Sequence, residues 1–207
     1  SFAERRVISM KIGDVPADDY PRKKLARLLS FVPQKTDIET DFTAEEIVMT
    51  GRTPYQGRFE GTSIGDKEAV YRAFSLTKAD KLKDKKFAVL SGGEKQKIVI
   101  ARAVAQNTPW MLLDEPIASL DIKNQIEIMK TLSELNRQEG VSVLMVLHDI
   151  NLAGIYCDRL IMLKDGQVIA AGNTNECLCE ENLKKLYDIS FFHMDTKKGQ
   201  RYYYAEV

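Results

Sequence analysis

Little in this sequence favours a secreted, membrane-spanning or nucleic-acid-binding protein. Only three of its 207 residues are cysteine, and this odd, sparse set argues against a disulfide framework and favours a reducing cytosol. The longest apolar runs, such as Trp110–Leu113 and Val143–Leu147, fall far short of the roughly 20 residues that span a membrane. Thirty basic residues balance thirty acidic ones, so no overall charge attracts nucleic acid or anionic lipid.

A glycine-rich phosphate-binding loop is also missing. The pattern G-x-x-x-x-G-K-[S/T], whose backbone cradles nucleotide phosphates, begins at none of the twelve glycines. Two other segments of a kind that handles nucleotide phosphates are present: Leu90–Glu94 reads Leu-Ser-Gly-Gly-Glu, and Leu113–Pro116 reads Leu-Asp-Glu-Pro. We therefore expect phosphate chemistry from a chain that lacks the usual phosphate cradle.

The apolar pattern predicts an α/β fold with a parallel sheet. Trp110–Asp114 and Val143–Leu147 are uninterrupted apolar segments, which is typical of strands buried on both faces of a sheet. Between them, Asp121–Gln138 carries apolar residues at helical spacing and is followed by Gly140. Strand, helix and strand in this order indicate parallel pairing with a right-handed crossover.

Periodicity, caps and turn residues predict the remaining elements. In chain order these are a strand over Val7–Ile12, a helix that opens at Asp18–Pro21 and includes Leu25, Leu28 and Leu29, a strand over Ser30–Gln34, a helix that opens at Thr43–Glu46, a loop over Gly51–Gly65, a helix over Asp66–Ala79, a helix from Ser91 to about Gln106, a hairpin over Leu160–Ala170 that turns at Asp165-Gly166, a helix over Glu181–Tyr187 and a hairpin over Phe191–Val207 that turns at Lys198-Gly199.

The segment Ser91–Glu94 is a candidate anion-binding site at a helix start. Ser91 and Glu94 stand three residues apart and form a capping box, with the serine as N-cap. Gly92 and Gly93 allow the backbone to approach a ligand closely, and the helix N-terminus offers unpaired N–H groups to a phosphate. The alternative is an ordinary helix start that happens to contain glycine.

Two further candidate sites lie where the apolar strands end. Asp114 and Glu115 follow the first strand and His148 follows the second, and open α/β sheets bind ligands at the carboxyl ends of their strands. Asp114 suits Mg²⁺, Glu115 can polarise an attacking water, and His148 can contact a phosphate oxygen or orient water. The alternatives are acids that merely meet solvent and a structural histidine, which is how we interpret His193.

Taken together, these segments resemble the nucleotide-binding subunit of ATP-binding cassette (ABC) transporters. Apart from the missing phosphate-binding loop, the family's motifs occur in the family's order, and Ile117-Ala118 departs from the more usual Thr-Ser. The matching segments are Phe31–Gln34 as the Q-loop, Leu90–Glu94 as the signature motif, Trp110–Pro116 as Walker B with the catalytic glutamate, Ser119–Asp121 as the D-loop and His148 as the switch histidine.

The resemblance implies a P-loop NTPase-like (RecA-like) parallel-sheet core with a helical subdomain. It divides the chain into residues 1–34 as the remnant of the N-terminal catalytic subdomain, 35–90 as the helical subdomain, 91–170 as the RecA-like core and 171–207 as a C-terminal helix and hairpin. Because the first strand is one that the family places after the phosphate cradle, the chain is expected to be N-terminally truncated. We expect it to bind ATP weakly or not at all by itself and to be prone to association.

The resemblance also assigns roles to individual residues, with ATP and Mg²⁺ as cofactors. Gln34 and His148 would sense the γ-phosphate, Asp114 and Gln34 would serve Mg²⁺, and Glu115 would activate water. The residues that would contact the nucleotide held by a second subunit are Ser91, Gly92, Gly93, Glu94 and Asp121.

The family's architecture implies the partners as well. We expect a head-to-tail dimer of ATPase subunits that docks on a polytopic membrane permease, with a substrate-binding protein as an indirect partner and no nucleic acid. This would place the chain in the cytoplasm, peripheral on the inner face of the cell membrane.

Three segments are similar to a narrower group, the importers of iron–siderophore complexes, haem and cobalamin. They are Leu25–Arg27, Val48–Tyr55 and His148–Ala153. Two other functions remain open: a scaffold without a phosphate cradle that binds a membrane partner without hydrolysis, and a soluble ABC-type ATPase of translation or DNA repair. The intact Asp114, Glu115 and His148 argue against the scaffold.

Overall fold

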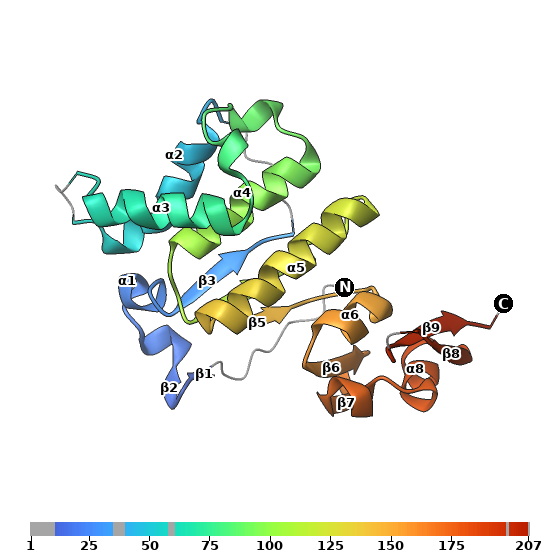
Figure 1. Ribbon diagram of the computed structural model, residues 1–207. Helices are drawn as coiled ribbons and strands as arrows, with labels where there is room; N and C mark the ends of the chain where they lie inside the picture. Colours follow the sequence, from blue (N-terminus) through green and yellow to red (C-terminus); the bar gives the residue numbers. More distant parts are fainter. Residues whose placement is uncertain (1–10, 35–39, 58–60, 198, 207) are drawn as a thin grey trace, which may run out of the picture.

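A three-stranded parallel sheet organises the protein. The computed structural model describes residues 11–34, 40–57, 61–197 and 199–206. Its central sheet consists of β3 (Leu29–Val32), β4 (Trp110–Leu113) and β5 (Ser142–Met145), in that spatial order (Figure 1). The register pairs Val32 with Leu113 and Leu113 with Met145, so all three strands end at one edge of the sheet. This confirms the predicted parallel α/β arrangement.

The sheet is buried on one face and open on the other. Val32, Met111 and Leu113 are buried, whereas the alternating side chains Phe31, Trp110 and Leu144 are 53%, 47% and 55% exposed. The prediction that β4 and β5 are buried on both faces is therefore wrong. In the described part of the chain, the core cluster packs on one face of the sheet, and the alternating residues on the other face are exposed or only partly buried.

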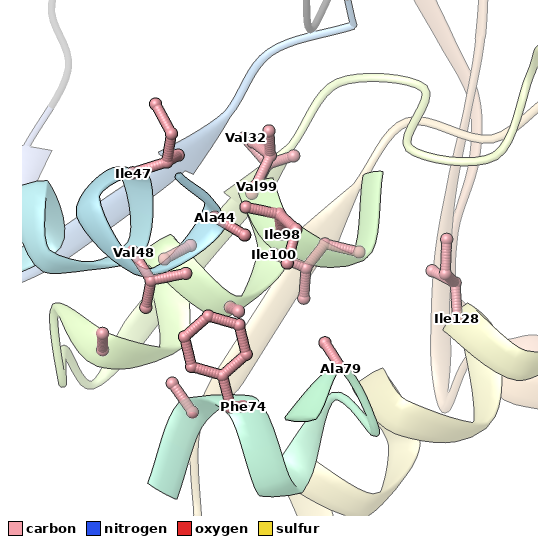
Figure 2. Packing of buried hydrophobic residues seen from close by; sticks show 14 of the residues in the cluster. Val32, Ala44, Ile47, Val48, Phe74, Ala79, Ile98, Val99, Ile100 and Ile128 are labelled. Atoms are coloured by element: carbon pink, nitrogen blue, oxygen red, sulfur yellow. The ribbon is translucent and has the colours of Figure 1, made fainter. Parts of the chain in front are cut away.

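Helices α4 (Gly92–Ala105) and α5 (Ile122–Glu139) supply much of that core. The cluster also holds side chains from β3 and from α3 (Ile64–Leu76), and Figure 2 shows Val32, Ile98 and Phe74 among its buried residues. Helix α5 begins at its cap Asp121 and ends at Gly140, which has φ +67° as a left-handed C-cap. Both ends of the helix agree with the sequence prediction.

The N-terminal helix is shorter than expected. The 3-10 helix η1 (Ala17–Asp19) and helix α1 (Arg22–Leu25) form, but Leu29 already pairs with Trp110 as the first residue of β3. The prediction that Leu29 continues the helix is therefore wrong, because strand pairing prevails over helical spacing there. Of the expected strand Val7–Ile12, only Lys11–Ile12 (β1) lies within the described residues, and it pairs with β2 (Val15–Pro16) in antiparallel fashion.

In the helical region between β3 and α4, one predicted helix cap is confirmed and the predicted bounds of a loop and of a helix are wrong. The capping box of Thr43 and Glu46 opens α2 (Ala44–Met49), as predicted. The expected loop Gly51–Gly65 is wrong in part, because it contains most of the 3-10 helix η2 (Thr50–Tyr55) and the start of α3 at Ile64. A second capping box, Ser63 with Asp66, accounts for that early start. Helix α3 ends at Leu76, and the short 3-10 helices η3 (Asp80–Leu82) and η4 (Phe87–Val89) lead to α4.

The C-terminal part packs around a second, smaller core cluster. The hairpin of β6 and β7 turns at Asp165 and Gly166, both with positive φ, as predicted. The second hairpin, β8 with β9, is also confirmed, although Lys198 of its expected turn lies outside the described residues. The elements here are α6 (Ile150–Tyr156), β6 (Arg159–Lys164), β7 (Gln167–Asn173), α7 (Thr174–Cys177), α8 (Glu180–Tyr187), β8 (Phe191–Asp195) and β9 (Arg201–Ala205).

Candidate functional site

Gln34, Glu115 and His148 meet at the carboxyl edge of the sheet. Each follows a different strand, and the parallel register brings the three strand ends level. Gln34 Nε2 donates to Glu115 Oε2 at 2.6 Å, and His148 Nε2 lies 2.7 Å from Glu115 Oε1. Both carboxylate oxygens of Glu115 are thus engaged, one by each neighbour. The sequence singled out these three residues separately, and the structure brings them together.

The hydrogen bonds act on the charge of Glu115. The bond with His148 is the largest cause that lowers the pKa of Glu115; partial burial opposes it, and the bond from Gln34 lowers the pKa further. The two side chains of this pair differ in exposure: that of His148 is 73% exposed, whereas that of Glu115 is only 22% exposed. Glu115 is therefore a carboxylate held ionised in a sheltered place beside a solvent-facing imidazole.

The backbone of Glu115 is itself unusual. Its φ is +45°, in the left-handed region that residues with a Cβ seldom adopt. Such conformations cost of order 1–3 kcal/mol and persist where the surroundings hold them. Here the turn after β4 directs the carboxylate toward Gln34 and His148.

Asp114 precedes Glu115 and lies apart from this hydrogen-bond group. Its backbone N–H donates to the Val32 carbonyl at 2.9 Å and extends the strand ladder. Within the described ranges its carboxylate makes no hydrogen bond or ion pair, so its oxygens are open to a cation. Those same ranges contain no preformed group of three His, Cys, Asp or Glu side chains that could hold a metal ion. An arrangement with one carboxylate suits Mg²⁺, which usually keeps waters and takes further oxygens from phosphates.

The signature segment Ser91–Glu94 opens α4 through the predicted capping box. The Glu94 N–H donates to Ser91 Oγ at 3.3 Å, and the Ser91 N–H donates to Glu94 Oε2 at 2.9 Å. The bond from the Ser91 backbone is the largest cause that lowers the pKa of Glu94. The capping box is confirmed, and Glu94 is engaged in holding the helix start.

The two glycines of this segment have different surroundings. A Cβ added to Gly92 would meet nothing within 4 Å, so this exposed residue leaves the helix start open to a ligand. Gly93 is buried, and a Cβ there would lie 2.7 Å from Cγ of Asn124. The backbone at Gly93 therefore packs closely on the Asn124 side chain of α5, whereas Gly92 has the open space that a close ligand approach needs.

Asp121 caps α5 and is bound to the same asparagine. The Asn124 N–H donates to Asp121 Oδ1 at 3.0 Å, and Asn124 Nδ2 donates to Asp121 Oδ2 at 2.7 Å. These two bonds, the backbone one first, lower the pKa of Asp121. The signature segment and Asp121 thus share a neighbour, and neither is hydrogen-bonded to Glu115. Asp121 is a residue type preferred at an N-cap, but no signal in the sequence indicated the role of the Asn124 side chain.

The segment Val48–Tyr55 forms a structural clamp. Buried Arg52 pairs with Asp66 through Nε and Oδ1 at 3.0 Å, donates to the Ala105 carbonyl at 2.7 Å and stacks over the Tyr55 ring at 3.9 Å. Although burial opposes it, the hydrogen bonds from Ser63 and Arg52 hold the pKa of Asp66 below its ordinary value. The clamp fastens η2 to the end of the signature helix α4. The sequence identified this segment by resemblance only, and the pairing of its Arg52 with Asp66 of α3 was missed.

Comparison with known proteins identifies the family. A model of the ABC transporter family matches residues 7–118, which is more than half of the chain, so the chain belongs to the ABC transporter family. Among the residues that the structure describes, no helix has both the length and the apolar character needed to cross a membrane. The predicted resemblance is therefore confirmed at the level of the family.

Relatives and solved structures point in the same direction. The chain is 38% identical over 176 residues to the ferric enterobactin transport ATP-binding protein FepC of Escherichia coli (strain K12), covering 85% of this chain and 65% of FepC. It is 37% identical over 163 residues to the cobalamin import ATP-binding protein BtuD of Halobacterium salinarum (strain ATCC 29341 / DSM 671 / R1), covering 79% of this chain and 40% of BtuD. The chain thus spans less than two thirds of the length of either relative.

A solved structure gives the corresponding likeness in three dimensions. The dimeric post-hydrolysis state of the ATP-binding cassette MJ0796, bound to ADP and Pi, superposes with a TM-score of 0.66 at 30% identity, covering 79% of this chain and 72% of that chain. The parallel sheet and its helices therefore have the fold of an ABC ATPase.

Proposed function

We propose that this chain supplies the water-activating and partner-closing parts of an ABC-type ATPase that energises an importer. The observation that carries the proposal is the contact of Glu115 with both Gln34 and His148 at the sheet edge. This is the edge at which open α/β sheets bind ligands. Family membership and the likeness to FepC support the assignment.

In this proposal Glu115 is the general base. A carboxylate within hydrogen-bond reach of a water can take its proton as the water attacks phosphorus. The bonds from His148 and Gln34 lower the pKa of Glu115 and so make it a weaker base. If a γ-phosphate takes over those two donors, the pKa of Glu115 rises and the carboxylate becomes a stronger base when substrate is in place.

Asp114 and Gln34 are the proposed Mg²⁺ ligands. Gln34 uses its amide nitrogen on Glu115, which leaves the amide oxygen available, and Asp114 offers an unengaged carboxylate. When bound with ATP, Mg²⁺ neutralises charge on the phosphate oxygens. Ser91, Gly92, Gly93 and Glu94 would close on the nucleotide of a second subunit, with Asp121 beside them. The dimeric form of MJ0796 supports this arrangement.

The missing phosphate-binding loop limits what this chain can do alone. Phosphoryl transfer depends on positioning and charge neutralisation, and a phosphate cradle provides much of both. We propose that the chain by itself binds ATP weakly and does not hydrolyse it. A segment carrying a G-x-x-x-x-G-K-[S/T] sequence would have to complete the site.

The relatives suggest the transport system. FepC and BtuD are named for ferric enterobactin and cobalamin, so we propose an iron–siderophore or cobalamin importer, with haem as the third member of the predicted group. The partners would be a second ATPase subunit and a polytopic permease, with the substrate-binding protein acting indirectly. The chain would lie in the cytoplasm against the inner face of the membrane.

A non-hydrolysing scaffold is the second candidate function, and the missing phosphate-binding loop favours it. The two candidates can be separated in a chimera, in which this chain replaces the 176-residue matching segment of FepC. An ATPase should hydrolyse ATP in this setting. A chimera that joins the membrane fraction yet never hydrolyses would favour the scaffold.

The chimera also tests the role of Glu115. Glu115→Gln should reduce the rate of ATP hydrolysis by at least about 10²-fold, the lower range for losing a general base, while ATP binding persists. Glu68→Gln is the matched control, because Glu68 is exposed on α3, away from the sheet edge. Equal hydrolysis by the Glu115→Gln chimera and its parent would remove Glu115 from the mechanism.

A further inference from the structure

Asn124 lies between two segments that the proposed function assigns to the subunit interface. On one side it fills the space over Gly93, where even a single added carbon would come within 2.7–2.9 Å of the amide Cγ, Nδ2 and Oδ1. Real Cβ atoms do not approach other atoms so closely, so the α4 backbone rests directly on this side chain. Gly93 is the third residue of the signature segment.

On its other side, Asn124 holds the carboxylate of Asp121. The backbone N–H and the side-chain Nδ2 of Asn124 each donate to a different oxygen of Asp121, at 3.0 and 2.7 Å. Asp121 ends the segment Ser119–Asp121, the predicted D-loop. One amide side chain therefore touches both the helix start that carries Ser91 and the loop that ends at Asp121.

A second link lies one helical turn further along both helices. Lys97 of α4 and Glu127 of α5 form an ion pair, with Nζ 2.6 Å from Oε2. The Lys97 side chain is 20% exposed and that of Glu127 is 40% exposed. Two successive turns of α4 are therefore fixed against α5, the first by the contact of Gly93 with Asn124 and the second by the ion pair of Lys97 with Glu127.

We propose that Asn124 is a positioning residue that makes the signature segment and the segment Ser119–Asp121 one mechanical unit. A shift of α5 toward α4 moves the Asn124 amide against the Gly93 backbone. A shift of Asp121 moves the same amide through their hydrogen bond. The two segments then meet a partner's nucleotide together. The catalytic meaning of this link rests on the proposed function, whereas the link itself does not.

Hydrogen–deuterium exchange on the chain as it stands tests the link. Asn124→Ala removes the amide, and Asn124→Asp keeps its size but places a second carboxylate beside Asp121. Lys130→Ala is the control, because Lys130 is exposed on the same helix. Both Asn124 variants should speed exchange severalfold at Glu94–Lys97 and at Leu120–Gln125, and Lys130→Ala at neither. Faster exchange at Leu120–Gln125 alone would overturn the proposal, since Asn124 would then be a local cap partner.

A packing cycle gives a readout that does not depend on exchange. Gly93→Ala should lower the urea midpoint of unfolding, because the added methyl collides with the Asn124 amide. In the Asn124→Ala background the methyl has room, so Gly93→Ala should cause little further loss. Contacting residues show such non-additive effects, whereas independent sites add. Equal lowering of the midpoint in both backgrounds would contradict the contact.

The FepC chimera provides the functional arm. Asn124→Asp should lower kcat for ATP hydrolysis by up to about 10²-fold, the cost of misplacing reacting groups by about 1 Å, and leave the KM for ATP nearly unchanged. Unchanged kcat together with faster exchange would overturn the catalytic meaning of the link. A parent chimera without activity would instead count against the proposed function, and the exchange and urea arms would still decide whether Asn124 couples the two segments.

Discussion

His148 Nε2 lies 2.7 Å from Glu115 Oε1, although the two residues follow different strands. The parallel register of β4 and β5 makes this contact possible, because both strands end at the same sheet edge. It joins an exposed imidazole, which can meet solvent or a phosphate, to a sheltered carboxylate. The ionisation of Glu115 thereby depends on where His148 points.

The first prediction follows from that dependence. His148→Ala should raise the pKa of Glu115 toward its ordinary value, because the bond from His148 is the largest cause of the lowering. The pKa of Glu115 is lower in the folded protein than in the unfolded chain. The stabilisation from its hydrogen bonds is therefore fully present above the unfolded-state pKa and is lost as the pH falls through the folded-state pKa. In His148→Ala that loss should begin at higher pH.

Carboxyl NMR titration of the chain, with Glu115 assigned by comparison with Glu115→Gln, measures this pKa directly. His193→Ala is the matched control, because His193 pairs with Glu180 in the C-terminal part. A Glu115 pKa that stays the same in His148→Ala would show that the imidazole does not control this carboxylate.

The second prediction concerns the left-handed backbone of Glu115. Glu115→Gly and Glu115→Ala both lose the bonds to Gln34 and His148, but only glycine adopts φ +45° without cost. Glu115→Gly should therefore be more stable than Glu115→Ala by about 1 kcal/mol. Urea denaturation of the two variants measures the difference. If alanine were the more stable replacement, the turn after β4 would not be strained.

The third prediction concerns the buried pair of Arg52 and Asp66. Arg52→Ala should lower the free energy of unfolding by about 3–5 kcal/mol, because it leaves a buried carboxylate without its partner. Lys185→Ala breaks an exposed pair with Glu181 and should change the free energy of unfolding little, because solvent screens exposed ion pairs. Chemical denaturation at neutral pH compares the two variants. Similar small losses would show that the clamp around Arg52 contributes little.

The same pair predicts a pH dependence of stability. The pKa of Asp66 is lowered in the folded protein by Ser63 and Arg52, against the effect of burial. Its contribution is present above the unfolded-state pKa of a carboxyl group and is lost as the pH falls through the lowered folded-state pKa. The unfolding midpoint should thus fall with acidification less steeply in Asp66→Asn than in the parent. Parallel curves would exclude a contribution from Asp66.

The fourth prediction compares two glycines. A Cβ at Gly51 would lie 2.3 Å from the Arg102 carbonyl oxygen, and that backbone atom cannot swing away as a side chain could. Gly51→Ala should destabilise the fold by at least about 1–3 kcal/mol, as overpacking does. Gly92→Ala meets open space and should leave the unfolding midpoint nearly unchanged. Thermal melts of both variants measure this difference. A Gly51→Ala variant as stable as the parent would contradict the close approach of η2 to α4.

The sequence was sufficient for the parallel sheet and for singling out Gln34, Glu115 and His148 one by one, but not for the two hydrogen bonds that join Gln34 and His148 to Glu115. Apolar runs locate strands, and parallel strands necessarily end at a shared edge. The same runs could not predict the exposure of Trp110 and Leu144, because the pattern identifies a strand without saying which elements cover each face.

Other features depend on contacts between distant segments. The 3-10 helix η2 was missed because its glycine suggested a loop, whereas Gly51 is small to let η2 approach the Arg102 carbonyl. Asn124 was missed because its partner Gly93 lies on another helix, and no local pattern records that contact.

The most direct test of the account is titration of the isolated, folded chain with a fluorescent ATP analogue. We predict no saturable binding through the micromolar range, because the proposed activating groups (Glu115, His148 and the signature segment) lack a glycine-rich loop in this sequence to hold the phosphates. Saturable micromolar binding by the chain alone would contradict the claim that it carries the activating groups of an ABC ATPase without its phosphate cradle.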